Sequence, residues 1–508
     1  MKRDYLPIET LSAWTRLNGI AVEGVAFRKL RADDGTDKGS AIVATGSQNG
    51  GGNGERPESE ESGVVAPGVT VLLRVPSDLV LSLGFVEDYA KSDRQLREVL
   101  EAVGGVGRTA RGAILIFLLV QLTHSSPDYA HERHAIGLSS PWTEYVKYMP
   151  AFVLLPTFYT DEEQELLRGT SLRLAVHAKI ASLEKEFEHL RRSTEGHAWC
   201  EKYWWSEDTG KLTFDDWKHV DALYRSRMVD LPRHGHAMVP CIDMANHAAE
   251  GTVKALYNED EDGNAVLQMR DGKSLREGEE VTISYGDDKP ASEMIFSYGF
   301  LDGEKATANQ IFLDLDIPDD DPLKIAKKAF CKDAPGVKLS STAIDSETGA
   351  TTSWDSPIIW WACVNEEDGL DFNVLQTTDG GRELRATWKG DDVKDPGCLR
   401  ELLAADPQWD IYQLRAVVLI LERLETQFFV LRQTDPMVLE IHENEDMRAI
   451  FRTEVFDTVL KLRDLESSLL EKGIEDLVRE RENLMASPAV SRYLTQQSGD
   501  VEEEDDFS

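Results

Sequence analysis

Cysteine is scarce in this chain, and the few cysteines stand far apart. The five residues form no CxxC or CxC pair, so the sequence lacks the local ligand set of a zinc knuckle. A sparse, odd number without a pairing pattern is typical of reduced thiols. The cysteines therefore predict an intracellular protein without a zinc knuckle.

Long apolar runs are also missing. The start, MKRDYLPIET, has no apolar core of the kind that a signal peptide requires. The longest apolar run, Ala113 to Leu122, is too short to span a bilayer and predicts a buried helix instead. We therefore expect no membrane contact. The location is predicted as cytoplasmic or nuclear, because no basic cluster of the kind that directs nuclear import decides between them.

Positive charge is scarce relative to negative charge. The 508 residues include 55 lysines and arginines against 92 aspartates and glutamates, which gives a formal net charge of −37. A surface this acidic repels phosphate backbones, so we expect no direct nucleic-acid binding. Charge favours a basic protein as the partner. The length is enough for more than one lobe, and we expect a monomer.

The order of the secondary-structure signals is distinctive. Short strands are predicted within 5–86 and 231–303, and between them lie 87–230, where apolar residues recur at helical spacing. A Gly/Ser/Glu-rich stretch, 46–63, is predicted to be a flexible loop. Residues 304–495 are predicted to be mainly helical, with 331–400 left unassigned, and 496–508 form an acidic tail. A β region is thus split by a helical insert.

Several short motifs, each weak alone, follow one another along the chain. They are SPWTEYVKYMP, LPTFYTDEEQELLRGT, RSRM, MVPCIDMANH, REGEEVTISYG and SYGFL. An Asn-His pair after a strand is usually an ordinary loop, and a Tyr-Gly at a strand end is usually a turn. In this order and spacing, however, residues 139–301 resemble the SET-domain methyltransferases of the Rubisco large-subunit methyltransferase type.

The resemblance implies an α+β fold, in which the SET-domain β-fold is interrupted by a helical insert and followed by a mainly α-helical lobe. Residues 5–86 and 231–303 would be the two parts of the SET domain, 87–230 the insert, and 304–495 a lobe that binds the protein substrate. The implied activity is S-adenosylmethionine-dependent methylation of a lysine in a protein. The acidic net charge favours a basic target, such as a ribosomal protein, a translation factor or a histone tail.

The resemblance also implies roles for particular residues around the Asn-His and Tyr-Gly motifs. Tyr285 resembles the catalytic tyrosine, and Tyr298 and Phe300 resemble the walls of the lysine channel. The residues that resemble the cofactor site are Arg227, Asp243, Met244, Ala245, Asn246 and His247.

The first cofactor loop departs from the family pattern. The usual form is Gly-x-Gly before a strand, and here the segment reads KGSAIVAT, with Ala41 in place of the second glycine. Lys38, Gly39 and Ser40 are the candidates for backbone contacts to S-adenosylmethionine. We expect Ala41 to force a small shift, because glycine permits a positive φ and a close backbone approach.

The chemistry of methyl transfer agrees with these residue types. Displacement at a sulfonium by an amine depends mostly on positioning and desolvation, so no metal is required. A lysine must lose its proton before it attacks, and an apolar aromatic channel lowers the pKa of the amine. Tyr298 and Phe300 suit that wall, and a hydroxyl from Tyr285 can orient the amine.

Two other functions remain open. A histidine methyltransferase is one, because the wider family includes an enzyme that acts on actin, although Tyr298 and Met228 look more like lysine-directed members. An interaction module that keeps the SET fold without turnover is the other. The long helical lobe and Ala41 would suit the module, whereas Tyr285 with its channel aromatics would not be needed for binding alone.

Overall fold

A computed structural model of the chain describes most of its residues. The described ranges are 1–31, 37–49, 69–130, 140–206, 212–249, 251–286, 288–301, 307–331, 335–342, 351–376 and 381–495. The predicted acidic tail and most of the predicted 46–63 loop lie outside these residues. The described end of that loop is not entirely irregular, because Gln48–Asn49 pairs as a short strand with Ser274–Leu275.

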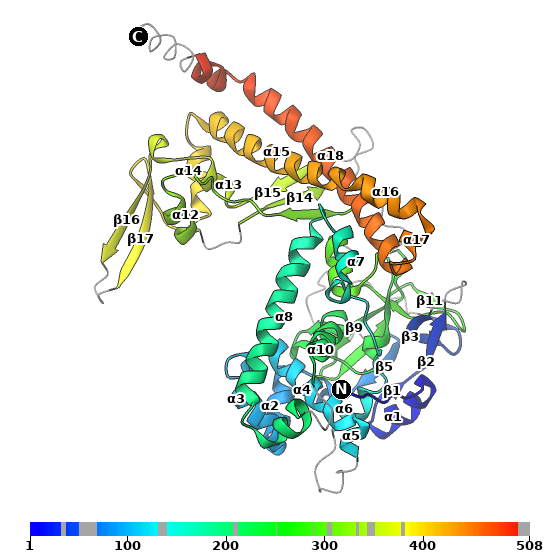
Figure 1. Cartoon of the computed structure of the whole chain (residues 1–508). Helices are drawn as coiled ribbons and strands as arrows, with labels where there is room; N and C mark the ends of the chain where they lie inside the picture. Colours follow the sequence, from blue (N-terminus) through cyan, green and yellow to red (C-terminus); the bar gives the residue numbers. More distant parts are fainter. Residues whose placement is uncertain are drawn as a thin grey trace. The chain divides into compact units, whose positions relative to one another are not determined.

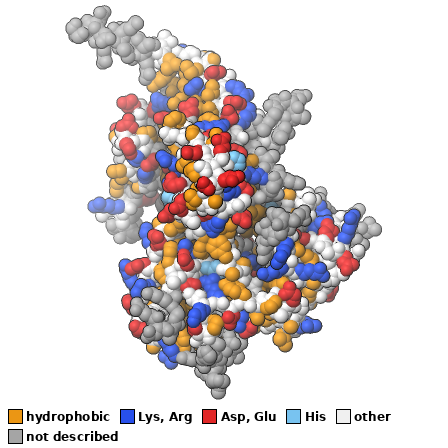
Figure 2. All heavy atoms as spheres, turned by 45° about the vertical axis from the view of Figure 1, so that its right-hand side comes forward, with side chains coloured by type: hydrophobic (Ala, Val, Ile, Leu, Met, Phe, Trp, Pro, Cys, Tyr) orange, Lys and Arg blue, Asp and Glu red, His pale blue; other side chains and the backbone are white. Residues whose placement is uncertain are grey.

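Contacts divide the chain into two compact units. The first comprises Met1–Phe158, Val176–Asp287 and Phe296–Asp302, and the second comprises Tyr159–Ala175, Asp288–Ile295 and Gly303–Ser508. Figure 1 labels the elements of both. Figure 2 shows acidic and basic side chains interspersed over one face of the molecule.

The first unit contains several small sheets. The largest is antiparallel with the order β1-β5-β10-β9, and its inner strand β10 is buried along its whole length, although Gln268 is polar. The other pairs are β2–β3, β4–β11, β6–β7 and the parallel pair β8–β12. The strands are β1 (Ala21–Val22), β2 (Val25–Arg31), β3 (Asp37–Ala44), β4 (Gln48–Asn49), β5 (Val71–Val75), β6 (Met228–Leu231), β7 (Gly235–Met238), β8 (Asn246–His247), β9 (Ala255–Glu259), β10 (Ala265–Met269), β11 (Ser274–Leu275) and β12 (Thr282–Ile283).

Helices gather around one apolar helix in this unit. That helix, α4, contains the longest apolar run of the sequence, and the run is buried as predicted; Thr109 caps its N-terminus. Figure 1 shows α2, α3 and α10 beside it. The helices are α1 (Leu11–Leu17), α2 (Leu83–Ser92), α3 (Arg94–Ala102), α4 (Ala110–Ser125), α5 (Pro127–Ala130), α6 (Pro141–Tyr145), α9 (Ala198–Cys200) and α10 (Phe214–Arg227), while α8 (Leu172–Thr194) and α11 (Ala291–Tyr298) have residues in both units.

The second unit is built on two long helices, α15 and α18, that run side by side. A three-stranded antiparallel sheet, β13-β14-β15, packs against α18, and a second one, β16-β17-β18, contacts α12. The helices are α7 (Asp161–Leu166), α12 (Lys324–Phe330), α13 (Ile359–Ala362), α14 (Cys398–Ala404), α15 (Trp409–Gln433), α16 (Asp435–Glu443), α17 (Glu445–Arg448) and α18 (Thr453–Met485). The strands are β13 (Gln310–Leu313), β14 (Val337–Ser341), β15 (Thr352–Asp355), β16 (Leu370–Gln376), β17 (Arg382–Trp388) and β18 (Asp391–Val393). The stretch that the sequence leaves unassigned thus supplies most of these strands.

A buried carboxyl group on α18 makes the second unit sensitive to pH. Glu466 accepts hydrogen bonds from the Ser171 backbone N–H at 2.8 Å and from the Ser171 hydroxyl at 2.5 Å. Burial raises the pKa of the Glu466 carboxyl to about 7. Because this pKa is higher in the folded chain than in the unfolded one, the group favours folding below about pH 4.5, and that contribution is lost as the pH rises through about 7.

The Glu466→Gln variant keeps an acceptor for Ser171 but does not titrate. We expect the thermal midpoint of the variant to rise relative to that of the native chain as the pH increases from 5 to 8. The midpoint is measured for the transition that includes α18. Comparing the two proteins at each pH cancels the other titrating groups. A constant difference across this range would contradict the raised pKa of Glu466.

None of the helices in the described ranges is both long enough and apolar enough to cross a membrane.

Candidate active site

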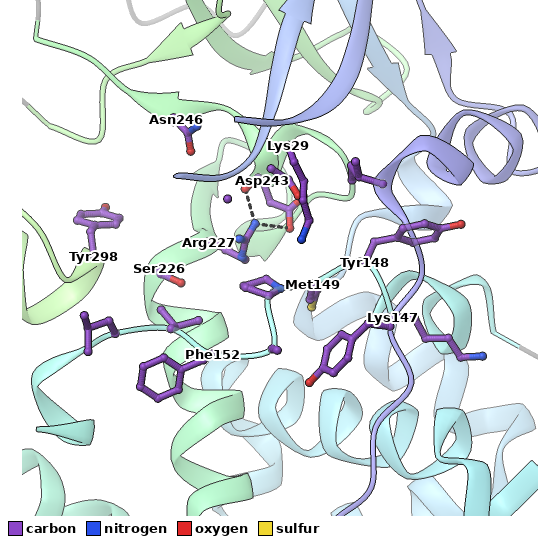
Figure 3. Close-up of a pocket in the computed structure, with 18 of the residues that line it drawn as sticks. Lys29, Lys147, Tyr148, Met149, Phe152, Ser226, Arg227, Asp243, Asn246 and Tyr298 are labelled. Carbon is purple, nitrogen blue, oxygen red and sulfur yellow. Dashed lines mark hydrogen bonds and ion pairs between the residues drawn. The ribbon is translucent and has the colours of Figure 1, made fainter. Parts of the chain in front are cut away.

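A cavity of about 570 Å³ lies in the first unit and is lined by residues from separate parts of the sequence (Figure 3). In this view Arg227 and Asp243 lie at the centre, with Asn246 and Tyr298 on one side and Lys147 and Tyr148 on the other. The lining residues are Tyr5, Leu6, Ile8, Lys29, Gly39, Ser40, Lys147, Tyr148, Met149, Pro150, Ala151, Phe152, Val153, Leu154, Ser226, Arg227, Asp243, Asn246, Tyr285, Tyr298 and Phe300.

The parallel pair β8–β12 brings the Asn-His motif to the Tyr-Gly motif. Asn246 pairs with Thr282, and His247 pairs with Ile283. Beyond this short ladder, the Tyr285 backbone N–H donates to His247 Nδ1 at 3.1 Å, and the Tyr285 hydroxyl donates to the Ala245 carbonyl at 2.9 Å. Segments about forty residues apart in the chain are therefore held as one site.

Aromatic rings form one wall of the cavity. The Tyr285 ring stacks on Tyr298 with centroids 4.5 Å apart, and its centroid lies 5.3 Å from that of His247 and 6.4 Å from that of Phe300. Gly299 makes this arrangement possible because its φ is +84°, and a Cβ there would lie 2.2 Å from the Leu154 carbonyl oxygen. The turn after α11 thus places both Tyr298 and Phe300 on the cavity.

A buried polar network supports the loop before Asn246. Arg227, the last residue of α10, donates to the Asp243 backbone carbonyl at 2.6 Å and pairs with the Asp243 carboxylate at 3.3 Å. The Tyr145 hydroxyl, from α6, donates to the same carboxylate and accepts from the Cys241 backbone N–H at 2.7 Å. Cys241 has a φ of +70°, which a non-glycine residue adopts only when its surroundings hold it there.

Burial dominates the ionisation of these groups. It raises the pKa of the Asp243 carboxyl, although Arg227 and the Tyr145 hydroxyl stabilise the charged form and oppose the shift. Burial likewise raises the pKa of the Tyr145 and Tyr285 hydroxyls. Tyr285 therefore remains protonated at neutral pH and acts as a hydrogen-bonding group rather than as a base.

The hairpin β2–β3 supplies another part of the cavity, through Lys29, Gly39 and Ser40. Gly39 carries the positive φ of this segment, +83°. Ala41 is fully buried opposite Arg28 and does not line the cavity, so the backbone freedom that this loop uses lies at Gly39 instead. Lys38 lies in β3, but its side chain is outside the described residues.

Comparisons with known proteins identify the fold. No protein-family model matches the chain. SET domain-containing protein 8 of Schizosaccharomyces pombe is 25% identical over 411 residues, which cover 80% of this chain and 88% of that protein. The SET domain of LSMT bound to lysine and AdoHcy superposes with a TM-score of 0.60 at 16% identity, covering 99% of both chains. Rubisco LSMT bound to sinefungin and monomethyllysine gives 0.57 at 15% identity, covering 94% of this chain and 92% of that one. The chain has the SET-domain fold of the Rubisco LSMT structures and is similar in sequence to SET-domain proteins.

Other relatives of the chain are methyltransferases that act on proteins. An actin-histidine N-methyltransferase of Gallus gallus is 23% identical over 356 residues, 68% of this chain and 54% of that protein. An N-lysine methyltransferase of Xenopus tropicalis is 24% identical over 262 residues, 47% of this chain and 50% of that protein. The predicted fold class is confirmed, and the cofactor prediction agrees with the AdoMet, AdoHcy and sinefungin bound in the solved structures.

The residues predicted for the site fall into two groups. Gly39, Ser40, Arg227, Asp243, Asn246, Tyr285, Tyr298 and Phe300 line the cavity. Met244 and Ala245 are buried and do not line it, and the His247 ring stacks on that of Tyr285, which does. Met228, which favoured lysine over histidine in the sequence, begins β6 and is not among the lining residues.

Sequence reasoning missed several residues of the site. The motifs SPWTEYVKYMP and REGEEVTISYG contain Tyr145 and Glu280. Nothing in either motif indicates that Tyr145 bonds to Asp243 or that Glu280 bonds to Asn246. Lys29, Phe152 and Ser226 also line the cavity. Their positions become apparent only when the hairpin and α10 are folded against the Asn-His loop.

The residues present fit S-adenosylmethionine in the cavity. Arg227 Nε is buried and has no hydrogen-bond partner among the described residues, although Arg227 lines the cavity. A buried donor of this kind requires an acceptor, and the carboxylate of the cofactor is one. Within the same ranges, no group of three or more His, Cys, Asp or Glu side chains is placed to hold a metal ion.

Glu280 holds the side chain of Asn246. The Asn246 amide donates to the Glu280 carboxylate at 2.6 Å, and Glu280 also bridges to Val43 of β3, so it links the Asn-His segment to the β2–β3 hairpin. A carboxylate accepts hydrogen bonds only, so Glu280 binds the NH₂ group of Asn246. The amide oxygen of Asn246 can then accept a hydrogen bond from the cofactor.

We expect Glu280→Ala to weaken S-adenosylmethionine binding roughly tenfold, and Glu280→Gln to restore most of it. Calorimetric titration of the cofactor measures both. Glu279→Ala is the matched control, because the neighbouring Glu279 pairs with Lys254 and not with Asn246. Equal affinities for the Glu280→Ala and Glu279→Ala variants would show that Glu280 does not orient Asn246.

Proposed function

We propose that this protein transfers a methyl group from S-adenosylmethionine to the side-chain amine of a lysine in a basic protein. The observation that carries the proposal is the stacked pair Tyr285 and Tyr298, which lines the same cavity as Arg227 and Asn246. An aromatic wall beside a polar pocket suits a cationic amine that must lose its proton before it reacts.

The residues of this chain would divide the work between binding and positioning. The apolar faces of Tyr298 and Phe300 disfavour the ammonium form of the lysine and so promote the neutral amine. The Tyr285 hydroxyl, held by the Ala245 carbonyl, would orient the amine toward the reacting carbon.

Arg227 and Asn246 would hold S-adenosylmethionine, through the unpartnered Arg227 Nε and through the amide that Glu280 orients. The bound cofactor supplies an electrophilic methyl group on its sulfonium. Gly39 and Ser40 would contribute backbone contacts at the other side of the pocket, where a positive φ permits close approach. Lys38, Asp243, Met244, Ala245 and His247 keep their proposed roles in the loops around the cofactor.

Histidine is the second candidate target, because actin-histidine N-methyltransferases are among the relatives. The imidazole of histidine is already largely neutral at physiological pH. It therefore does not need an apolar wall to lower its pKa, whereas the amine of lysine does. The stacked tyrosine wall therefore supports lysine over histidine.

A transfer assay with labelled S-adenosylmethionine tests the proposal. The full-length chain is mixed with a lysate fraction enriched in basic proteins, beside its Tyr285→Phe variant. We expect a labelled band that is lost in the variant, with the label on lysine after acid hydrolysis. Label on histidine would replace lysine by the second candidate. Cofactor binding by calorimetry with no label in any fraction would contradict methyl transfer and favour a non-catalytic interaction module.

A further inference from the structure

A second cavity, of about 550 Å³, lies within the second unit. It is formed where β15, α13, α14, α15 and α18 meet, and Figure 1 shows these elements together. The side chains that give the cavity its chemistry are Trp354, Asp355, Trp360, Arg400 and Glu480. It therefore combines indole rings with carboxylates, and it does not share a residue with the cavity of the first unit.

The two tryptophans have different surroundings. The Trp360 ring is buried, stacks on Trp409 with centroids 5.1 Å apart, and has the Arg400 guanidinium 5.6 Å from its centroid. Trp354 is only half-buried, and its indole N–H donates to the Glu480 carboxylate at 3.4 Å. The chain thus already places a guanidinium over one of these rings, and the other ring is oriented by a carboxylate.

The carboxylates of this cavity form no ion pair among the described residues. Two cations are nevertheless near them, because Arg400 lines the same cavity and Lys338 lies opposite Asp355 in the pairing of β14 with β15. Asp476, one turn before Glu480 on α18, differs because it pairs with Arg479 at 2.6 Å and accepts from Thr352. The cavity therefore has two carboxylates and one guanidinium in its lining, which leaves a net negative charge next to a partly exposed aromatic ring.

We propose that this cavity binds a basic side chain, an arginine or a lysine, of the protein that the enzyme methylates. A cation gains from the face of an indole ring and from carboxylates at once, and it gains more where part of its hydration is removed. The net charge of −37 further favours basic partners over acidic ones. The identity of the partner as the substrate rests on the proposed function, whereas the binding of a basic side chain does not.

Binding can be measured without methyl transfer. The full-length chain is labelled with ¹⁵N at its indole nitrogens, and the Trp354 signal is identified with a Trp354→Phe variant. N-acetyl-arginine methylamide, its lysine analogue and its glutamate analogue are then titrated in turn. We expect the Trp354 signal to move saturably with the arginine and lysine probes and to stay in place with the glutamate probe, while the signal of the buried Trp388 stays constant.

Two variants of equal net charge distinguish binding in the cavity from non-specific attraction of the probe to an acidic surface. Glu480→Gln should weaken the binding of the arginine probe roughly fivefold or more, whereas Glu482→Gln, an exposed position on the same helix, should leave it unchanged. No saturable movement of the Trp354 signal, an equal loss in both variants, or movement with the glutamate probe would overturn the proposal.

The link to the substrate is tested separately on the labelled protein found in the transfer assay. Glu480→Gln should raise KM for that protein with kcat unchanged, and it should not affect transfer to N-acetyl-lysine methylamide as a minimal acceptor. A normal KM in this variant would overturn the assignment of the basic side chain to the substrate. Absence of all methyl transfer would instead count against the proposed function and leave the result of the titration standing.

Discussion

Replacement of Tyr285 by phenylalanine is expected to lower the rate of methyl transfer roughly a hundredfold, while S-adenosylmethionine still binds. The change removes only a hydroxyl that donates to the Ala245 carbonyl. The ring itself is held between His247 and Tyr298 by stacking that phenylalanine retains. The loss should therefore fall on kcat rather than on the affinity for the cofactor.

Single-turnover transfer and calorimetric titration together measure this effect. Tyr224→Phe is the matched control, because Tyr224 is also a buried tyrosine of the first unit but does not line the cavity. Its rate should stay within about twofold of the native one, since its hydroxyl lies 3.5 Å from His236 and makes at most a weak hydrogen bond. A native rate in Tyr285→Phe would remove Tyr285 from the catalytic role.

The pH dependence of the transfer rate is a second test of the role of Tyr285. Burial raises the pKa of the Tyr285 hydroxyl, so it should not ionise below about pH 10. A rise in rate between pH 7 and 9 would then reflect the loss of the proton from the target lysine. Tyr285→Phe should lower the whole profile without moving its midpoint.

The short motifs of the sequence contain several residues that line the candidate site. Asn246, Tyr285 and Tyr298 belong to local patterns in which the residue type and its place after a strand or helix are both distinctive. In the structure these residues line one cavity, where the β8–β12 pairing and the positive φ of Gly299 bring their segments together.

The partners of these residues could not be predicted in the same way. Tyr145 bonds to Asp243 across 98 positions, and Glu280 bonds to Asn246 across 34, so each contact depends on how distant elements pack. The strands of 331–400 were missed for a related reason. In β16, most side chains are exposed, so the alternation of apolar and polar residues that marks a half-buried strand is absent.

Removal of the Arg227 side chain is expected to cost about 3 kcal/mol of folding stability and at least tenfold in cofactor affinity. Asp243 is almost completely buried, and Arg227 is the cation beside it. In Arg227→Ala the carboxylate keeps the Tyr145 hydroxyl but loses its ion pair, and the loop loses the donor to the Asp243 carbonyl. An uncompensated buried charge is far more costly than the loss of an exposed pair.

Denaturant unfolding of the first unit measures the loss, with Arg94→Ala as the control. Arg94 pairs with Glu98 on an exposed helix face, and its removal should leave the free energy of unfolding almost unchanged. The difference in the free energy of unfolding between the native chain and Arg227→Ala should also grow as the pH rises from 5 to 8. Burial already raises the pKa of Asp243, the loss of Arg227 raises it further, and the stability that a raised pKa provides at low pH is lost as the group ionises.

Adding Asp243→Asn to Arg227→Ala separates the two roles of the arginine. The amide removes the buried charge, so the double variant should recover much of the stability. The pH dependence of the stability that Asp243 causes should also disappear. Cofactor affinity should stay low, because Arg227 Nε, the buried donor without a partner, is still missing. If affinity returned together with stability, Arg227 would serve the fold of the loop and not the binding of the cofactor.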